Sequence, residues 1–226
     1  MWHLLLIFIL FLLTSTFFPQ IVKGENEIGF TPSDSIFDDK ILLNGYIKKY
    51  QNASKETLLP MLGDESLTPY KSAAAIYVLA QDYLSEVVAG EKNFIEKNLL
   101  RRLNRTDSAF VEVELMHALV VLDRYKYFKV MVPALIKKMD HYNQAVGDNA
   151  FDRLVSITET GSNKAREARI VLNTLRKMFF LMRNRLQNVN EPGAKLKQKL
   201  ILLRWAIKVL GTQTLDQLPA EVVRLL

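Results

Sequence analysis

The chain has 226 residues, of which 49% are hydrophobic and 24% charged, the balance of a folded globular protein rather than a disordered one. It contains no cysteine and 3 histidines, which excludes disulfides, cysteine-ligated metals and thiol catalysis and leaves little material for a histidine-rich metal site. The formal net charge is +6, so acidic partners are favoured over basic ones.

The first apolar segment has the character of an export signal. Residues 4–18 are nearly unbroken Leu, Ile and Phe, and as a helix they reach about 22 Å, short of the roughly 30 Å hydrocarbon core of a bilayer. Val22 and Gly24 suit the −3 and −1 positions of a signal-peptidase site. We expect residues 1–24 to be a cleaved signal peptide that exports the chain to the periplasm or the exterior. The alternative is an uncleaved membrane anchor, because no Lys or Arg precedes the apolar run.

The remainder of the chain is predicted to be helical. Residues 25–37 are rich in turn formers and predict an extended leader, and residues 38–226 predict a single α-helical domain. Apolar residues recur at helical spacing throughout, and no period-two run predicts a strand. The expected helices are 38–50, 55–62, 68–89, 94–103, 108–122, 125–139, 148–157, 162–186, 194–210 and a short one after Pro219.

A leucine-rich pattern repeats along the chain. Leu58–Leu62 and Leu99–Leu103 each precede a polar turn and a second helix, at an offset of 41 residues, and Met131–Leu135 repeats the pattern a third time. A two-helix period near 40 residues resembles the HEAT and armadillo class of repeats. The resemblance implies an all-α solenoid of stacked antiparallel helix pairs. The third unit departs from it, with a spacing of 32 residues and a Gly147-Asp148 interruption, so an irregular helical bundle is the alternative.

Stacking of these pairs predicts a set of core residues. They are Leu59, Leu62, Ala74, Leu79, Leu103, Leu119, Leu122, Leu135, Val171 and Leu175.

No catalytic, metal-binding or cofactor-binding residue is assigned. Glu114 and His117 have the Glu-x-x-His spacing of di-iron bundles, but those sites need two such pairs and two further glutamates. We interpret His117 as a half-buried structural residue, and His141 as a residue that interacts with the carbonyls of a helix end. No nucleophile elbow, phosphate-binding loop or dinucleotide fingerprint is present. We therefore expect no enzyme, with a carboxylate- or metal-dependent envelope enzyme as an alternative.

Charge is distributed unevenly along the chain. Residues 164–208 carry twelve basic side chains against Glu167 and Glu191, a net charge of +10, whereas residues 25–163 carry −4. A candidate basic binding face consists of Arg166, Arg169, Arg176, Arg183, Lys197, Arg204 and Lys208. Its expected partners are an acidic protein, an anionic membrane surface or an envelope polymer. Nucleic acid is not expected, because the chain is predicted to be exported and lacks interleaved aromatic residues.

The function predicted from these patterns is that of an exported, non-enzymatic binding or scaffolding module. A helical-repeat surface would recognise a protein partner, since solenoids present extended surfaces for binding. The alternative is peripheral binding to a membrane or envelope polymer through the basic C-terminal helices.

Overall fold

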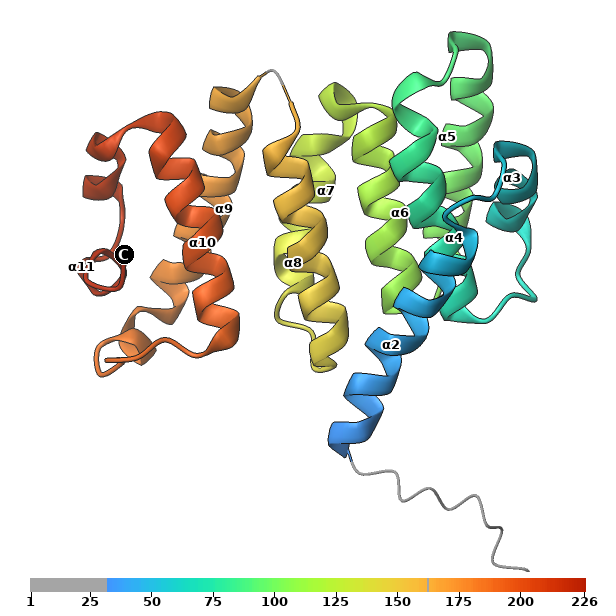
Figure 1. The fold of residues 1–226 in the computed structure, drawn as a ribbon. Helices are drawn as coiled ribbons and strands as arrows, with labels where there is room; N and C mark the ends of the chain where they lie inside the picture. Colours follow the sequence, from blue (N-terminus) through green and yellow to red (C-terminus); the bar gives the residue numbers. More distant parts are fainter. Residues whose placement is uncertain (1–31, 162) are drawn as a thin grey trace, which may run out of the picture. The chain divides into compact units, whose positions relative to one another are not determined.

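The computed structural model describes residues 32–161 and 163–226, and this part of the chain contains helices and no strand. The predicted signal peptide, residues 1–24, and residues 25–31 of the predicted leader lie outside these residues. The chain divides into a unit of residues 1–35 and a unit of residues 36–226, and the helix packing described below belongs to the second (Figure 1). The elements are α2 (Pro32–Tyr50), α3 (Lys55–Gly63), α4 (Pro69–Asp82), the 3₁₀ turn η1 (Leu84–Glu86), α5 (Ala89–Leu103), α6 (Ala109–Leu122), α7 (Arg124–Lys138), α8 (Gln144–Glu159), α9 (Lys164–Leu186), α10 (Ala194–Leu210), η2 (Thr212–Gln217) and α11 (Ala220–Val223).

Several helix boundaries differ from the prediction. α2 begins at Pro32 and not at Asp38, so residues 32–37 of the predicted leader are helical; proline is well tolerated at the first position of a helix. The predicted helix 68–89 is too long, because α4 ends at Asp82, and Gly90 lies in the first turn of α5, which begins at Ala89. Gly147 lies inside α8, which begins at Gln144.

Close packing explains why residue 147 is a glycine. A Cβ atom at this position would lie 2.8 Å from the carbonyl oxygen of Met139, which is closer than real Cβ contacts. The glycine therefore allows the first turn of α8 to approach the end of α7, and it does not interrupt a helix.

The helices form pairs that stack in chain order. α3 and α4, α5 and α6, α7 and α8, and α9 and α10 each pack together. The second helices of successive pairs pack against each other, α4 against α6 and α6 against α8. Among the first helices, α3 packs against α5 and α7 packs against α9. No extensive contact joins the first pair to the last within the described residues. The predicted all-α fold and the stacking of its antiparallel pairs are confirmed.

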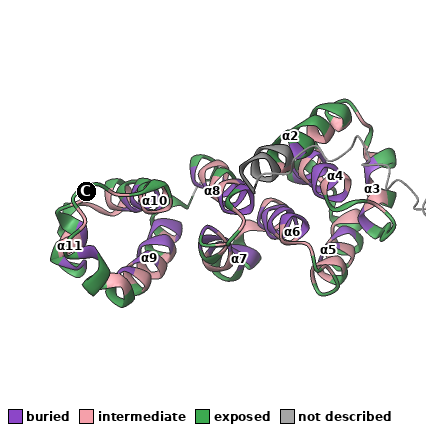
Figure 2. Cartoon of the chain, turned by 90° about the horizontal axis from the view of Figure 1, so that it is seen from below, coloured by how far each residue is buried: buried purple, intermediate pink, exposed green. Residues whose placement is uncertain are grey.

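Helix α6 is the centre of this stack. Nearly all of its residues are buried, because α4, α5, α7 and α8 pack around it. Its sequence is accordingly apolar on every side, as expected of an enclosed helix. Figure 2 shows α6 between its neighbours, with the buried residues turned toward the interior.

Most of the predicted core is confirmed, and two residues are wrong. Leu59 and Leu103 are only partly buried, because the preceding residue Leu58 faces the core in place of Leu59, and Leu103 is the last residue of α5. The buried members are Leu62, Ala74, Leu79, Leu119, Leu122, Leu135, Val171 and Leu175.

The junction between the third and fourth pairs is rich in polar contacts. Arg124 at the start of α7 donates to both carboxylate oxygens of Glu167 on α9, at 2.5 and 2.7 Å. The buried Lys199 of α10 pairs with Asp140, and Gln198 donates to Asp148 at 2.7 Å. The interface of α4 with α6 is built instead from alanines and aliphatic side chains.

No helix within the described residues has the length and apolar character needed to span a bilayer.

Candidate functional site

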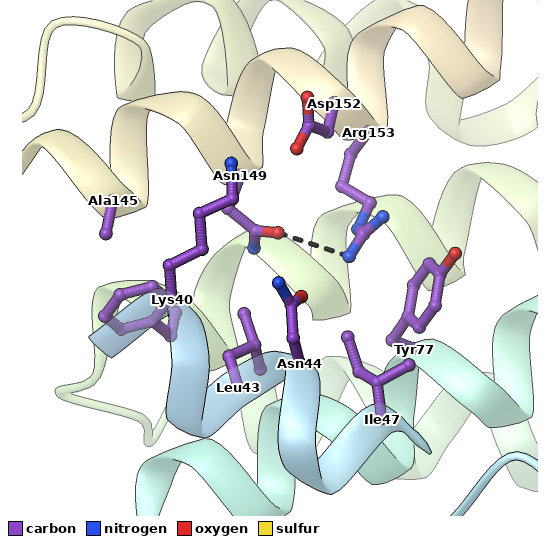
Figure 3. Close-up of a pocket in the computed structure, with 10 residues that line it drawn as sticks. Lys40, Leu43, Asn44, Ile47, Tyr77, Ala145, Asn149, Asp152 and Arg153 are labelled. Atoms are coloured by element: carbon purple, nitrogen blue, oxygen red, sulfur yellow. Dashed lines mark hydrogen bonds between the residues drawn. The ribbon is translucent and has the colours of Figure 1, made fainter. Parts of the chain in front are cut away.

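Two pockets lie along one side of α4, α6 and α8, which we call the α4–α6–α8 face. The first has a volume of about 160 Å³ and lies between this face and α2, which runs across it (Figure 3). The face contributes Tyr77, Phe110, Ala145, Asn149, Asp152 and Arg153, a set that we call the α2 seat. Helix α2 contributes Lys40, Leu43, Asn44 and Ile47.

Helix α2 is held on this side by a few specific contacts. The Asp39 carboxylate accepts hydrogen bonds from the Tyr70 hydroxyl and, at 2.9 Å, from the side-chain amide of Asn143. Leu43 is 3% exposed, and the Lys71 ammonium lies 5.7 Å from the centroid of the Tyr46 ring. Burial and the bond to Asp39 raise the pKa of Tyr70 to about 12, so this hydroxyl stays protonated and continues to donate.

A buried polar cluster lies beneath the α2 seat. Glu114 is fully buried on α6 and accepts from Arg153 Nε at 2.9 and 3.0 Å and from Asn149 Nδ2 at 2.9 Å. Arg153 also donates to Asn149 at 3.2 Å and stacks on the Tyr77 ring at 3.7 Å (Figure 3). Burial raises the pKa of Glu114, and the Arg153 charge and these hydrogen bonds oppose that rise. The carboxylate is therefore engaged as the partner of an arginine.

His117 lies one turn after Glu114 and is also fully buried rather than half-buried. Its ring centroid is 6.2 Å from that of Tyr77. Burial, together with the Arg153 charge, lowers the pKa of His117 to about 3, so the imidazole is neutral near pH 7. Its Nδ1 atom has no hydrogen-bond partner in the described part of the chain. Among the described side chains, no three His, Asp or Glu residues are grouped to hold a metal ion.

The second pocket is open and lies on the same face, near the C-terminal ends of α4, α6 and α8. Its volume is about 320 Å³. The lining residues are Ala80, Gln81 and Ser85 from α4 and η1, His117, Val120 and Val121 from α6, Arg124, and Ser156, Ile157, Thr160 and Gly161 from α8 and the turn after it. The pocket thus combines aliphatic side chains with hydroxyl and amide groups.

The predicted basic face is largely engaged with the chain itself. Arg176 donates to Gln217 at 3.0 Å, Arg183 to Glu221 at 3.0 Å, and Arg204 to the Leu226 carbonyl at 3.1 Å. The structure thus directs these three toward the C-terminal segment 212–226, which packs on α9 and α10.

The other four basic residues lie in different settings. The Arg166 guanidinium lies 4.3 Å from the centroid of the Tyr125 ring. Arg169 lines a small pocket with Gln213 and Gln217, next to the same C-terminal segment. Arg169, Lys197 and Lys208 are exposed and form no ion pair with another described residue.

His141 acts as an acceptor and not as the donor expected at a helix end. Its Nδ1 accepts from the backbone N–H of Asn143 at 3.2 Å, and Asn143 in turn caps α8 through a bond to the Ala145 N–H. The residue therefore helps to shape the turn before α8.

The ion pair of Glu114 with Arg153 is absent from the sequence prediction. The two residues are 39 positions apart, and only the stacking of α6 on α8 brings them together. The available signal is Glu114 between apolar neighbours in a mainly apolar helix, because a buried carboxylate requires a cation or hydrogen-bond donors as partners.

The chain matches no protein-family model, no curated protein and no solved structure. The chain is a stack of helix pairs. One face of this stack, the α4–α6–α8 face, holds α2 over one pocket and carries a second, open pocket.

Proposed function

We propose that this protein is an exported, non-enzymatic binding module of the HEAT and armadillo class that recognises a protein partner through the α4–α6–α8 face. The observation that carries the proposal is the pair of pockets along three successive second helices. One pocket is covered by a helix of the chain itself, and the other is open. Extended surfaces of this kind are what stacked helix pairs offer to partners.

The character of the open pocket supports a protein partner. Val121 is partly exposed above the buried Val120 and Ile157, and Gln81 and Ser156 offer hydrogen-bonding groups beside it. Apolar contact area flanked by polar groups is the composition of protein interfaces.

The two alternatives have less support. The Glu114 oxygens are occupied by Arg153 and Asn149, so the Glu-x-x-His pair does not offer the open ligand set that a hydrolytic site requires. Of the seven residues of the predicted basic face, Arg166, Arg176, Arg183 and Arg204 hold contacts within the chain, which leaves Arg169, Lys197 and Lys208 for an acidic partner or an anionic membrane.

Affinity capture with matched variants tests this proposal. The exported chain is used as bait in the fraction into which it is secreted, beside the variants Val121→Arg and Ser156→Arg in the open pocket. Val130→Arg on α7 is the control, because Val130 is 62% exposed and lies outside both pockets. We expect one protein to be retained in stoichiometric amount by the wild type and the control, and to be lost with both pocket variants. Retention of the same proteins by all four chains, with unchanged helicity, would contradict the proposal.

A further inference from the structure

Helix α2 fits its seat incompletely. A cavity of about 160 Å³ remains between the helix and the seat, and the α2 residues Lys40 and Asn44 that line it are exposed. Leu43 is the one buried residue among Asp39–Tyr50. Ile41 and Leu42 remain exposed at 64% and 45%. An enclosed helix such as α6 buries nearly all its apolar side chains, so α2 is attached to the stack rather than built into it.

The connection of α2 to the stack allows it to leave. Four residues, Gln51–Ser54, join its C-terminal end to α3. The Tyr83 hydroxyl donates to the Ala53 carbonyl at 2.8 Å and fixes the far side of this connection. Helix α2 can therefore swing about the exposed turn at Gln51 and Asn52, while α4, α6 and α8 keep their own contacts.

Beside the α2 seat, two donors bind one carboxylate of the helix. The Tyr70 hydroxyl and the Asn143 side-chain amide both donate to the Asp39 carboxylate at one end of the α2 contact. Leu43 and Ile47 follow Asp39 at intervals of four residues, so the three share one side of the helix and meet the seat. The recognition pattern is thus a carboxylate followed by aliphatic residues four and eight positions later.

We infer that the α2 seat is the docking site of a partner helix with this pattern, and that α2 is a displaceable occupant of the seat. The inference rests on the proposed function, because it places part of the partner's binding site under α2, on the covered half of the α4–α6–α8 face. A partner helix that also reaches the open pocket would gain the contacts of Val121 and Ser156, which α2 does not make. That difference in contact is what would favour the partner over α2.

Exchange of α2 can be measured with a labelled peptide. The probe is a fluorescent peptide of residues 36–50, and the receptor is the full exported chain carrying Tyr46→Cys on α2 and Lys71→Cys on α4. The Lys71 ammonium lies 5.7 Å from the centroid of the Tyr46 ring, neither residue lines the cavity, and the natural chain has no cysteine that could compete. One sample is bridged with a short bismaleimide, which closes α2 on the seat. The matched control is the same chain with each thiol capped by N-ethylmaleimide.

If α2 is displaceable, the peptide binds the capped chain saturably and the bridged chain at least tenfold more weakly. A capped chain that also carries Leu43→Ala should bind the peptide at least tenfold more tightly, because its own α2 competes less well. A peptide with Asp39→Lys should bind at least tenfold more weakly, since the two donors lose their acceptor. Helicity of each chain is followed by circular dichroism.

Three results would overturn the inference. They are equal binding to the bridged and capped chains, no binding to the chain with Leu43→Ala, and dimerisation of the wild-type chain that bridging abolishes. The last result would identify a second copy of this chain as the occupant. None of these results depends on capture through Val121 and Ser156, so the proposed function is tested separately.

Discussion

Glu114 and Arg153 place a full ion pair inside the helix stack, where each charge depends on the other. Removal of one partner from a buried pair leaves the other charge desolvated, whereas replacement of both by apolar groups can be neutral. The Asn149 amide and the Tyr77 ring complete the surroundings of the pair and fix the positions of the two side chains. The cluster therefore supports the α2 seat from below.

Arg153→Met should lower the free energy of unfolding by about 3–5 kcal/mol, because it leaves the Glu114 carboxylate buried without a cation. The double variant Glu114→Leu with Arg153→Met should recover much of this loss. Urea denaturation of the two single variants and the double variant gives the coupling energy directly. A loss below about 1 kcal/mol for Arg153→Met would show that the pair is not coupled to folding.

His117 links stability to pH in a direction that follows from its pKa. The folded protein binds a proton at His117 only near pH 3, whereas the unfolded chain binds one near pH 6.5. The unfolded state therefore holds more protons between these values, and stability falls as the pH is lowered through this window. The wild type should lose about 1.4 kcal/mol per pH unit below 6.5 relative to His117→Leu, or about 2 kcal/mol between pH 7 and pH 5. Denaturation curves of both proteins at several pH values measure this difference, and parallel pH dependence would refute it.

At the scale of the element, helical periodicity predicts which segments fold, and packing decides where some of them end. Helix α6 and helix α10 lie where the apolar spacing places them. The sequence predicts a break at Gly147, because it does not show that Met139 approaches this position. The α2 seat could not be predicted either, since its members come from three helices and meet only in the stack.

Gly147→Ala tests this account of α8. Alanine favours a helix over glycine by about 1 kcal/mol, yet its Cβ would lie 2.8 Å from the Met139 carbonyl oxygen. We expect the variant to destabilise the protein by about 1–3 kcal/mol, as overpacked sites do. Gly90→Ala in α5 is the control, because a Cβ atom there would meet nothing within 4 Å, and it should raise stability by up to about 1 kcal/mol. The urea midpoints of the two variants measure these changes in stability, and a Gly147→Ala variant more stable than the wild type would remove the packing explanation.

At the scale of the whole molecule, the proposed function depends on export. Residues 1–24 lie outside the described residues, and their assignment as a signal peptide remains a prediction from the short apolar run and the small residues near Gly24.

We expect a mature N-terminus at Glu25. Intact-mass measurement or N-terminal sequencing of the protein from the secreted fraction provides the test. Recovery of a chain that retains Met1–Gly24 in the membrane fraction would establish an anchored protein instead.

The polar junction of the third and fourth helix pairs has a consequence for the cooperativity of unfolding. Stacked pairs share stability only through their nearest neighbours, so a junction held by ion pairs divides the stack when those pairs weaken. Arg124 with Glu167 and Lys199 with Asp140 join α9 and α10 to the preceding pairs, and the double variant Glu167→Gln with Asp140→Asn removes both ion pairs. Calorimetry should therefore record one transition for the wild type and two for this variant, in which α9 to α11 melt first. A protease added in that interval would digest α9 to α11 and leave the preceding helix pairs as one resistant fragment.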